Sequence, residues 1–214
     1  MMNSRTKIIF LTLALTFAMT GAAIAQNVIW DQTEGYESWS MGFFNVIAGG
    51  PPMGMTMYTV NDVVVPAEGW TIDTIKIYYD GFNPGWAGAL TSGIVYLEAK
   101  TGSMPTGDPS TGTAVPVTCV LLGNGFLEVF ATDLGMVLTE GEYWIGLTPN
   151  TPNADNIHVS VAAVGDDSPT YDPNGFPGGW SNWAADLDGA MLIEGMGPVS
   201  TEAVSLGSVK ALFR

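Results

Sequence analysis

The sequence predicts an all-β protein, folded as a single antiparallel β-sandwich of jelly-roll type, on three observations. Apolar and polar residues alternate over many short segments, as they do in strands with one buried face. Residues that favour turns separate these segments, and the chain has 27 glycines and 13 prolines. No long stretch keeps the apolar period of about 3.6 residues that marks an amphipathic helix.

Each expected strand is a short apolar segment bounded by turn-forming residues. The expected strands cover residues 28–31, 41–48, 55–65, 70–79, 93–99, 115–121, 125–130, 142–148, 157–164 and 189–195. Two of these strands alternate clearly enough to predict which side chains face the core. The predicted core side chains on them are Val95, Leu97, Ala99, Tyr143, Ile145 and Leu147. Between two apolar segments, Gly123-Asn124-Gly125 predicts a tight hairpin turn, because these residues tolerate a positive φ.

The N-terminal segment predicts export from the cytoplasm. Basic residues Arg5 and Lys7 precede an apolar run over 8–19, and small residues follow at Ala23 and Ala25. This order is typical of a secretory signal peptide that is cleaved after Ala25. A retained anchor is the alternative, although the run is shorter than the about 20 apolar residues of a membrane-spanning helix.

Three parts follow from this division of the chain. Residues 1–25 form the expected signal peptide, 26–197 one β-sandwich domain, and 198–214 a C-terminal tail. No other segment has the length and apolarity to cross a bilayer, so we expect no membrane span after cleavage. The expected location is therefore secreted or at the cell surface.

The charge of the chain excludes whole classes of partner. The sequence has 21 acidic residues and 6 basic ones, and Arg5 and Lys7 leave with the signal peptide. Such a negative protein repels phosphate backbones and anionic lipid surfaces, so nucleic acid is not an expected partner.

Cys119 is the only cysteine, so no internal disulfide can form and a small buried thiol is expected.

Two segments resemble secreted bacterial β-sandwich proteins of unassigned activity. They are the run VNDVVVPAEGWTIDTI at 60–75 and the run LTEGEYWI at 138–145. The closing run LGSVKALFR at 206–214 resembles a short C-terminal tail found on exported proteins of some uncultivated bacteria. The resemblance implies an extracellular sandwich and, for the tail, a sorting signal.

An acidic loop at 165–188 is the first candidate for chemistry, because a loop of this length inside a compact domain is usually functional or organised by a ligand. Its carboxylates are Asp166, Asp167, Asp172, Asp186 and Asp188. Calcium takes six to eight oxygen ligands of this kind, so calcium is the cofactor that the loop would bind. The spacing of an EF-hand is absent, and a solvated acidic loop is the alternative.

Aromatic residues outside the predicted core faces are the second candidate. Trp144 and Tyr96 alternate onto the polar sides of their strands, and three tryptophans at 86, 180 and 183 lie in glycine-rich loops. Exposed flat rings can stack on the CH groups of a sugar while carboxylates and amides bind its hydroxyls. The candidate glycan-binding residues are therefore Trp144, Tyr96, Trp86, Trp180 and Trp183. Large aromatics that fill the core or cover loop bases are the alternative.

Catalysis has weaker support in the sequence. Glu98 and Glu128 are the acids placed within apolar strands, and a glycosidase would need two such carboxylates near each other. His158, the single histidine, lies two residues from Ser160, so the two side chains would lie side by side without sharing a hydrogen bond.

We expect a secreted or cell-surface module without catalysis that binds extracellular glycan or cell-surface components. A structural component of an extracellular layer and a glycan-acting hydrolase remain the alternatives.

Overall fold

The computed structural model describes residues 27–33, 42–44, 47–48, 56–80, 84–151, 159–164, 168–173, 178–182 and 187–198. The expected signal peptide and the last 16 residues of the expected tail, 199–214, lie outside this part of the chain. The described residues form three β-sheets and two short 3-10 helices, η1 (Pro84–Trp86) and η2 (Pro109–Thr111).

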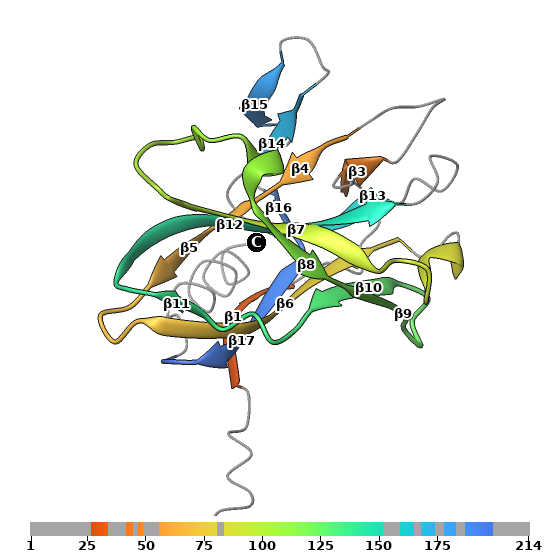
Figure 1. Cartoon of the computed structure of the whole chain (residues 1–214), viewed down its shortest axis with the longest axis horizontal. Coiled ribbons are helices and arrows are strands. Elements are labelled where there is room, and N and C mark those ends of the chain that lie inside the picture. Colours follow the sequence, from red (N-terminus) through yellow and green to blue (C-terminus); the bar gives the residue numbers. More distant parts are fainter. Residues whose placement is uncertain are drawn as a thin grey trace, which may run out of the picture.

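Each sheet takes strands from distant parts of the sequence (Figure 1). The large sheet contains β1 (Asn27–Gln32), β17 (Met191–Met196), β6 (Trp70–Tyr79), β10 (Leu127–Ala131) and β9 (Thr118–Leu121) in this order, with β2 (Gly42–Phe44), β11 (Met136–Leu138), β13 (Val159–Val164) and β16 (Leu187–Gly189) attached. The small sheet contains β3 (Ile47–Ala48), β12 (Gly141–Thr151), β7 (Ser92–Ala99) and β8 (Thr113–Pro116), with β5 (Asn61–Val65) beside β12. The third sheet contains β15 (Gly179–Asn182), β14 (Pro169–Asp172) and β4 (Tyr58–Thr59).

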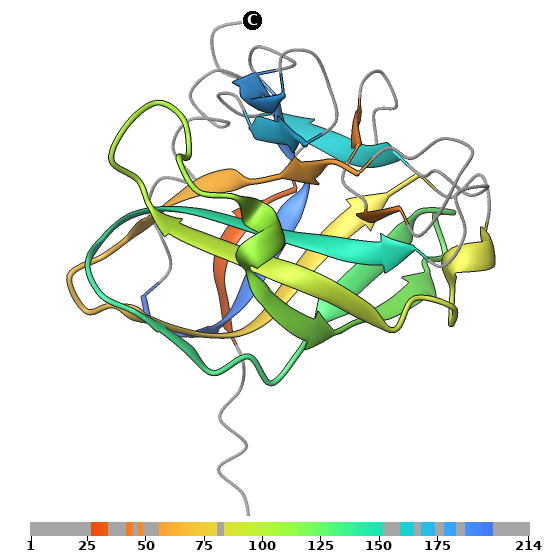
Figure 2. The ribbon, with the colours of Figure 1, turned by 45° about the horizontal axis from the view of Figure 1, so that its top comes forward.

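The prediction of an all-β antiparallel sandwich is confirmed. The large and small sheets pack face to face (Figure 2), and every described strand pair is antiparallel except β3 with β12. The finer assignment to a jelly roll stays a prediction. Within the described residues there is no helix long and apolar enough to span a bilayer.

The main core lies between the large and small sheets. Ile145 and Leu147 of β12 are fully buried there, Val95 of β7 is 2% exposed, and Tyr143 packs at the margin. The core prediction is therefore correct for β12 and for the first half of β7. It is wrong for Leu97, which is 37% exposed, and for Ala99, because β8 pairs with β7 only as far as Val95. Beyond Val95 no described strand pairs with that edge of β7, so Leu97 and Ala99 lie where the sheet edge is open to solvent.

The hairpin turn between β9 and β10 forms where the sequence predicts it. Leu122 N–H donates to the Phe126 carbonyl over 2.8 Å, and Gly125 has φ +88°. A side chain at Gly125 would be strained in this left-handed conformation. The two strands pair in register from Leu127 opposite Leu121.

The chain changes sheet between β4 and β5, and this crossing places the third sheet over the small one. β4 pairs with β14, whereas β5, two residues later, pairs with β12. The crossing backbone passes directly over Gly146, where a Cβ atom would lie 2.5 Å from the Thr59 carbonyl oxygen and 3.0 Å from Val60 Cγ1. Only glycine permits this approach. The third sheet consequently covers the outer face of the small sheet, away from the main core.

The crossing predicts a specific sensitivity to a single methyl group. We expect Gly146→Ala to lower the free energy of unfolding by about 1–3 kcal/mol, because the backbone at Thr59 would have to move away. Gly123→Ala is the matched control, since a Cβ there meets nothing within 4 Å, and it is expected to change stability by less than about 0.5 kcal/mol. Urea denaturation of both variants measures the difference. Equal stabilities would contradict the close crossing.

Candidate functional site

Five aromatic side chains gather on the outer face of the small sheet, and we call them the aromatic site. They are Tyr58, Tyr96, Trp144, Tyr171 and Trp180. Tyr96 and Trp144 form its floor, because they follow or precede core residues Val95 and Ile145 and therefore point outward from the sheet. The third sheet contributes the other three rings. The structure thus brings together Tyr96, Trp144 and Trp180, three of the five aromatics that the sequence singled out.

The predicted exposure of the floor residues is wrong. Trp144 is 3% exposed and Tyr96 7% exposed, because Val60 and Trp180 pack on them from above. The alternation placed these side chains on the correct face of their strands. That face is covered by a second layer. The layer could not be predicted, because β14 and β15 are short and lie in a segment rich in glycine and proline.

The accessible part of the aromatic site is the pair Tyr171 and Trp180. They lie opposite each other on β14 and β15, with ring centroids 5.2 Å apart and planes inclined at 59°. Trp180 also contacts Tyr96 at 5.7 Å, and Tyr171 contacts Tyr58 at 6.3 Å. Both side chains are half-buried, so they still present surface to solvent, and Trp180 rests on the floor. Tyr171 is a site residue that sequence reasoning missed, since it lies within the predicted acidic loop.

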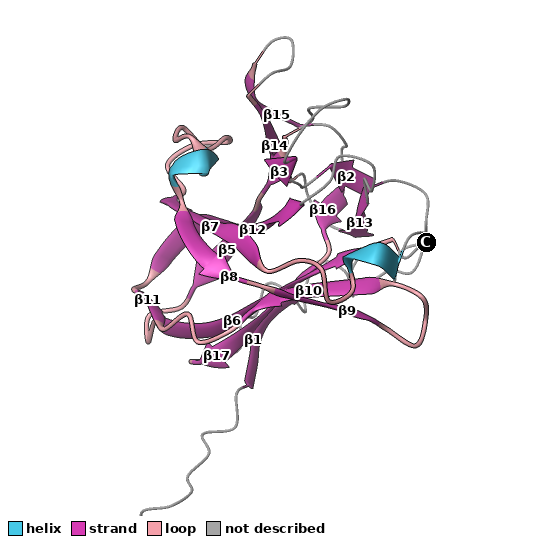
Figure 3. Cartoon of the chain, turned by 45° about the vertical axis from the view of Figure 1, so that its right-hand side comes forward, coloured by secondary structure: helices cyan, strands magenta, loops and turns pink. Residues whose placement is uncertain are grey.

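Glu98 of β7 fastens the loop at 101–112 beside these rings. Its carboxylate accepts hydrogen bonds from the backbone N–H groups of Thr106 and Gly107, both at 2.9 Å, and from the Thr106 hydroxyl at 2.7 Å. The Tyr96 hydroxyl donates to the same carboxylate. On the other side, Trp180 Nε1–H donates to the Gly107 carbonyl over 2.8 Å. The loop and the β14–β15 hairpin therefore stand on the same side of the molecule, with η2 (cyan, upper left) beside the hairpin in Figure 3.

These contacts set the charge of the site. Partial burial raises the pKa of Glu98, but the hydrogen bonds from Tyr96, Gly107 and Thr106 outweigh it and bring the pKa down to about 2. Burial and the neighbouring Glu98 raise the pKa of Tyr96, so its hydroxyl remains protonated and able to donate. Burial, with the nearby charge of Asp108, also raises the pKa of Tyr58. The site therefore contains neutral tyrosines next to a permanently charged carboxylate.

Lys100 closes one end of the floor. Its ammonium group contacts the Asp62 carboxylate, lies 3.8 Å from Glu142 Oε2, and sits 4.8 Å from the centre of the Trp144 ring. The Trp144 Nε1–H is buried without a hydrogen-bond acceptor among the described residues. Such a group costs about 1–3 kcal/mol, and the cation over the ring offsets about 0.5–1 kcal/mol of it.

The two acids that a glycosidase would need are not assembled. Glu98 faces outward from the small sheet, next to Tyr96. Glu128 lies on β10 between Leu127 and Val129, which are both fully buried in the main core, so its side chain faces outward from the large sheet. The whole sandwich separates the two carboxylates. The low pKa of Glu98 is also the reverse of what a general acid requires.

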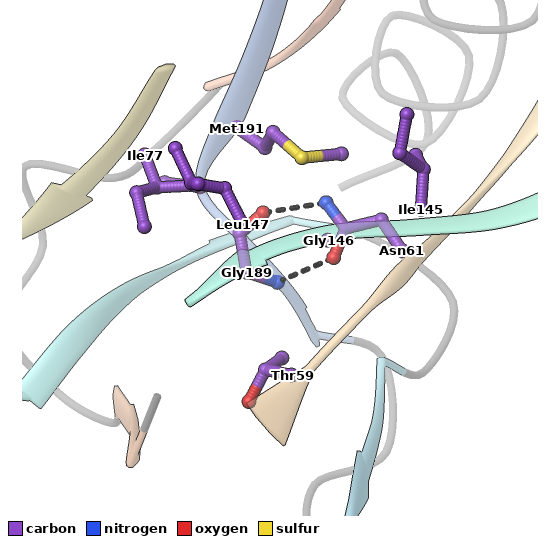
Figure 4. Close-up of a pocket in the computed structure, with 9 residues that line it drawn as sticks. Thr59, Asn61, Ile77, Ile145, Gly146, Leu147, Gly189 and Met191 are labelled. Carbon is purple, nitrogen blue, oxygen red and sulfur yellow. Dashed lines mark hydrogen bonds between the residues drawn. The ribbon is translucent and has the colours of Figure 1, made fainter. Parts of the chain in front are cut away.

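A small cavity between the sheets is bordered by a group of hydrogen bonds around Asn61. It has about 10 Å³ of space, roughly what one water molecule needs, and Asn61 and Gly189 lie at its wall (Figure 4). The Asn61 amide donates to the Gly189 carbonyl over 2.7 Å and accepts from the Gly189 N–H at 3.2 Å. The Ser168 hydroxyl donates to Asn61 Oδ1 and accepts from the same N–H at 2.9 Å. This closed arrangement joins β5, β16 and the start of β14.

The remaining aromatic candidates lie elsewhere. Trp86 of η1 is 2% exposed and packs in the main core, edge-to-face against Tyr79 with ring centroids 5.2 Å apart. Its predicted exposure in a loop is wrong, because η1 turns the ring inward over the end of β6. Trp183 lies outside the described residues, as does His158. Cys119 is buried as expected, and burial raises the pKa of its thiol to about 11.

The calcium prediction concerns mostly residues that the structure does not describe. Asp166, Asp167 and Asp186 lie outside the described ranges. Asp188 is 4% exposed and accepts a hydrogen bond from Ser168 at 3.3 Å, while Asp172 is half-buried at the end of β14. Among the described residues there is no group of three or more His, Cys, Asp or Glu side chains that could hold a metal ion. Calcium binding by this segment stays a prediction.

The fold and the site define an all-β sandwich whose small sheet bears an aromatic outer face under a third sheet. No protein-family model, curated protein or solved structure matches the chain. The resemblance to secreted bacterial sandwich proteins therefore stays a prediction.

The role of Glu98 as an anchor is testable by hydrogen exchange. Glu98→Gln replaces a charged acceptor by an amide that presents its NH2 group to some of the same donors, so we expect faster exchange of the Thr106 and Gly107 amides. The stability loss should be about 1 kcal/mol, since the group is largely solvated. Glu128→Gln, the same change on the opposite face, should leave both amides unchanged. Unaltered exchange in Glu98→Gln would contradict the anchor.

The same contact predicts a pH dependence with a definite sign. Folding lowers the pKa of Glu98 from its ordinary value of 4.5 to about 2. Its contribution to stability is therefore complete above about pH 5 and is lost as the pH falls through this window. The stability difference between the wild type and Glu98→Gln should shrink between pH 5 and pH 2. A difference that grows towards acid would reverse the sign and refute the assignment.

Proposed function

We propose that this protein is an exported, non-catalytic module that binds carbohydrate through Tyr171 and Trp180. The observation that carries the proposal is that these two rings are half-buried yet held in place, with Trp180 resting on Tyr96 and tied to Gly107. A rigid, partly exposed aromatic surface loses little conformational entropy when a ligand binds. Sugars bind to such surfaces because their CH groups form apolar faces.

Polar groups for the sugar hydroxyls surround the same rings. Asp108 is exposed and follows Gly107 directly, and the exposed Thr106 and Ser110 flank it on the loop. Asp108 is the N-cap of η2, and its Oδ1 atom accepts a hydrogen bond from the Ser110 N–H. This bond holds the carboxylate in one orientation and leaves the second oxygen available for a ligand. Carboxylates and hydroxyls are the groups with which proteins fix the orientation of a bound polar ligand.

Two observations support a module without catalysis. Glu98 and Glu128 face away from each other across the sandwich, so they do not form the carboxylate pair of a glycosidase. The cavity at Asn61 has only about 10 Å³ of space, which is too little for a sugar ring. The expected location, secreted or at the cell surface, follows from the leader sequence at 1–25.

Binding of neutral hexasaccharides, measured by calorimetry, tests the proposal. The panel contains β-linked hexamers of glucose, N-acetylglucosamine, mannose and xylose. We expect at least one to bind, and Trp180→Ala and Tyr171→Ala each to weaken it by about tenfold or more, because central aromatic contacts dominate such interfaces. Tyr171→Ala keeps the hydrogen bond from Trp180 to Gly107 and so separates lost stacking from a displaced loop.

The control is Phe130→Ala, which removes a half-buried ring from the outer face of the large sheet. Its affinity should equal that of the wild type, and near-ultraviolet circular dichroism verifies the fold of each variant. If no hexasaccharide binds, the amine-bearing glucosamine hexamer described below included, or if both site variants bind as the wild type does, the proposal is wrong.

A further inference from the structure

The aromatic site has two carboxylates, Glu98 and Asp108, that form no ion pair with any basic residue in the described part of the chain. Glu98 is hydrogen-bonded to the loop by neutral donors alone, and it is ionised at every pH above about 3 because its pKa is about 2. Asp108 lies close enough for its charge to raise the pKa of both Tyr58 and Tyr96. Two carboxylates thus flank the row of rings.

The two basic residues in the described part of the chain, Lys76 and Lys100, are paired with carboxylates other than Glu98 and Asp108. Lys100 contacts Asp62 and Glu142 at the far end of the floor. Lys76 pairs with Glu194 over 2.7 Å on the large sheet. With 21 acidic residues against 6 basic ones in the whole sequence, the surrounding field does not compensate the site either.

We infer that the ligand of this site is a glycan that carries protonated amines, such as a chain of β-linked glucosamine units. The inference rests on the proposed function and adds the chemical class of the sugar. Aromatic rings attract cations through their faces, and a carboxylate beside them adds a charge-assisted hydrogen bond to an ammonium group. Asp108 provides such a carboxylate. It follows Gly107, whose carbonyl accepts the hydrogen bond from the Trp180 indole N–H, so it lies at the margin of the Trp180 ring.

Other sugar classes fit these contacts less well. Uronic acid and sulfated glycans would bring their negative charges next to Glu98 and Asp108 and would be repelled. Neutral glycans can stack on Trp180 and Tyr171 but bring no positive charge to pair with Glu98 or Asp108.

The test compares a hexamer of β-1,4-linked glucosamine with its N-acetylated counterpart at mildly acidic pH and low salt. The two ligands share one backbone and differ in the charge of the nitrogen. We expect the amine form to bind at least about fivefold more tightly, a preference that added salt should reduce. Asp108→Asn should reduce the preference by about two- to fivefold, because it removes one exposed charge contact. Asparagine caps a helix as well as aspartate does, so η2 should keep its conformation.

Glu128→Gln is the matched control for attraction to the whole protein. It removes the same single charge from the opposite face of the sandwich. If Asp108→Asn lowers the preference and Glu128→Gln does not, the amine binds at the aromatic site. Equal binding of the two hexamers, or equal effects of the two variants, would overturn the inference while leaving the proposed function intact. Failure of both hexamers and of every neutral hexasaccharide to bind would instead refute the proposed function.

Discussion

The change of sheet between Tyr58 and Val65 is the constraint on which the rest of this structure depends. Within eight residues the chain leaves the third sheet, crosses Gly146 and enters the small sheet as β5. Asn61 lies just after the crossing and hydrogen-bonds the Gly189 backbone with both ends of its amide. This buried side chain thereby replaces a strand neighbour for Gly189. The three sheets meet at this one amide, in a protein whose single cysteine can form no internal disulfide.

A second layer over the small sheet changes what an alternating strand means. In an ordinary sandwich the outward residues of a strand face water, and their side chains are polar. Here β7 and β12 have apolar residues on both faces, with Val95 and Ile145 in the main core and the aromatic Tyr96 and Trp144 under the third sheet. In the sequence, Tyr96 and Trp144 look like an exposed binding surface. In the structure they are buried and support the half-exposed Trp180 above them.

The part of the fold that the sequence predicts is the part held by long, regular strands. Tyr143, Ile145 and Leu147 alternate with residues of the other face along β12, a strand of 11 residues, and this pattern predicts which face packs in the main core. β14 and β15 have four residues each and contain turn-forming residues, so local pattern cannot distinguish them from the predicted loop. β14 joins the third sheet by pairing with Tyr58 and Thr59 of β4, more than 100 residues earlier in the chain. Non-local pairing of this kind leaves no periodic signal.

The residues of the candidate site also fall into two groups, those that the sequence identifies and those that only the fold reveals. Trp180 was identifiable because a tryptophan in a glycine-rich segment is conspicuous, and Tyr96 and Trp144 because they break the polar side of their strands. Tyr171 and the anchoring role of Glu98 were not identifiable, since both depend on which loop lies over which strand. Glu98 and Glu128 look equivalent in the sequence. Only the assignment of β7 and β10 to different sheets separates them.

The pairing of β1 with β17 joins the first described strand to the last. Asn27 lies opposite Gly195, and Ile29 and Trp30 enter the main core from β1 beside Ile193. The large sheet therefore cannot be completed until the final strand is available, which gives the domain many contacts between residues far apart in sequence and favours slow folding. A chain that emerges from N-terminus to C-terminus, through a ribosome or a translocation channel, would hold an unfinished sheet until β17 had cleared the exit.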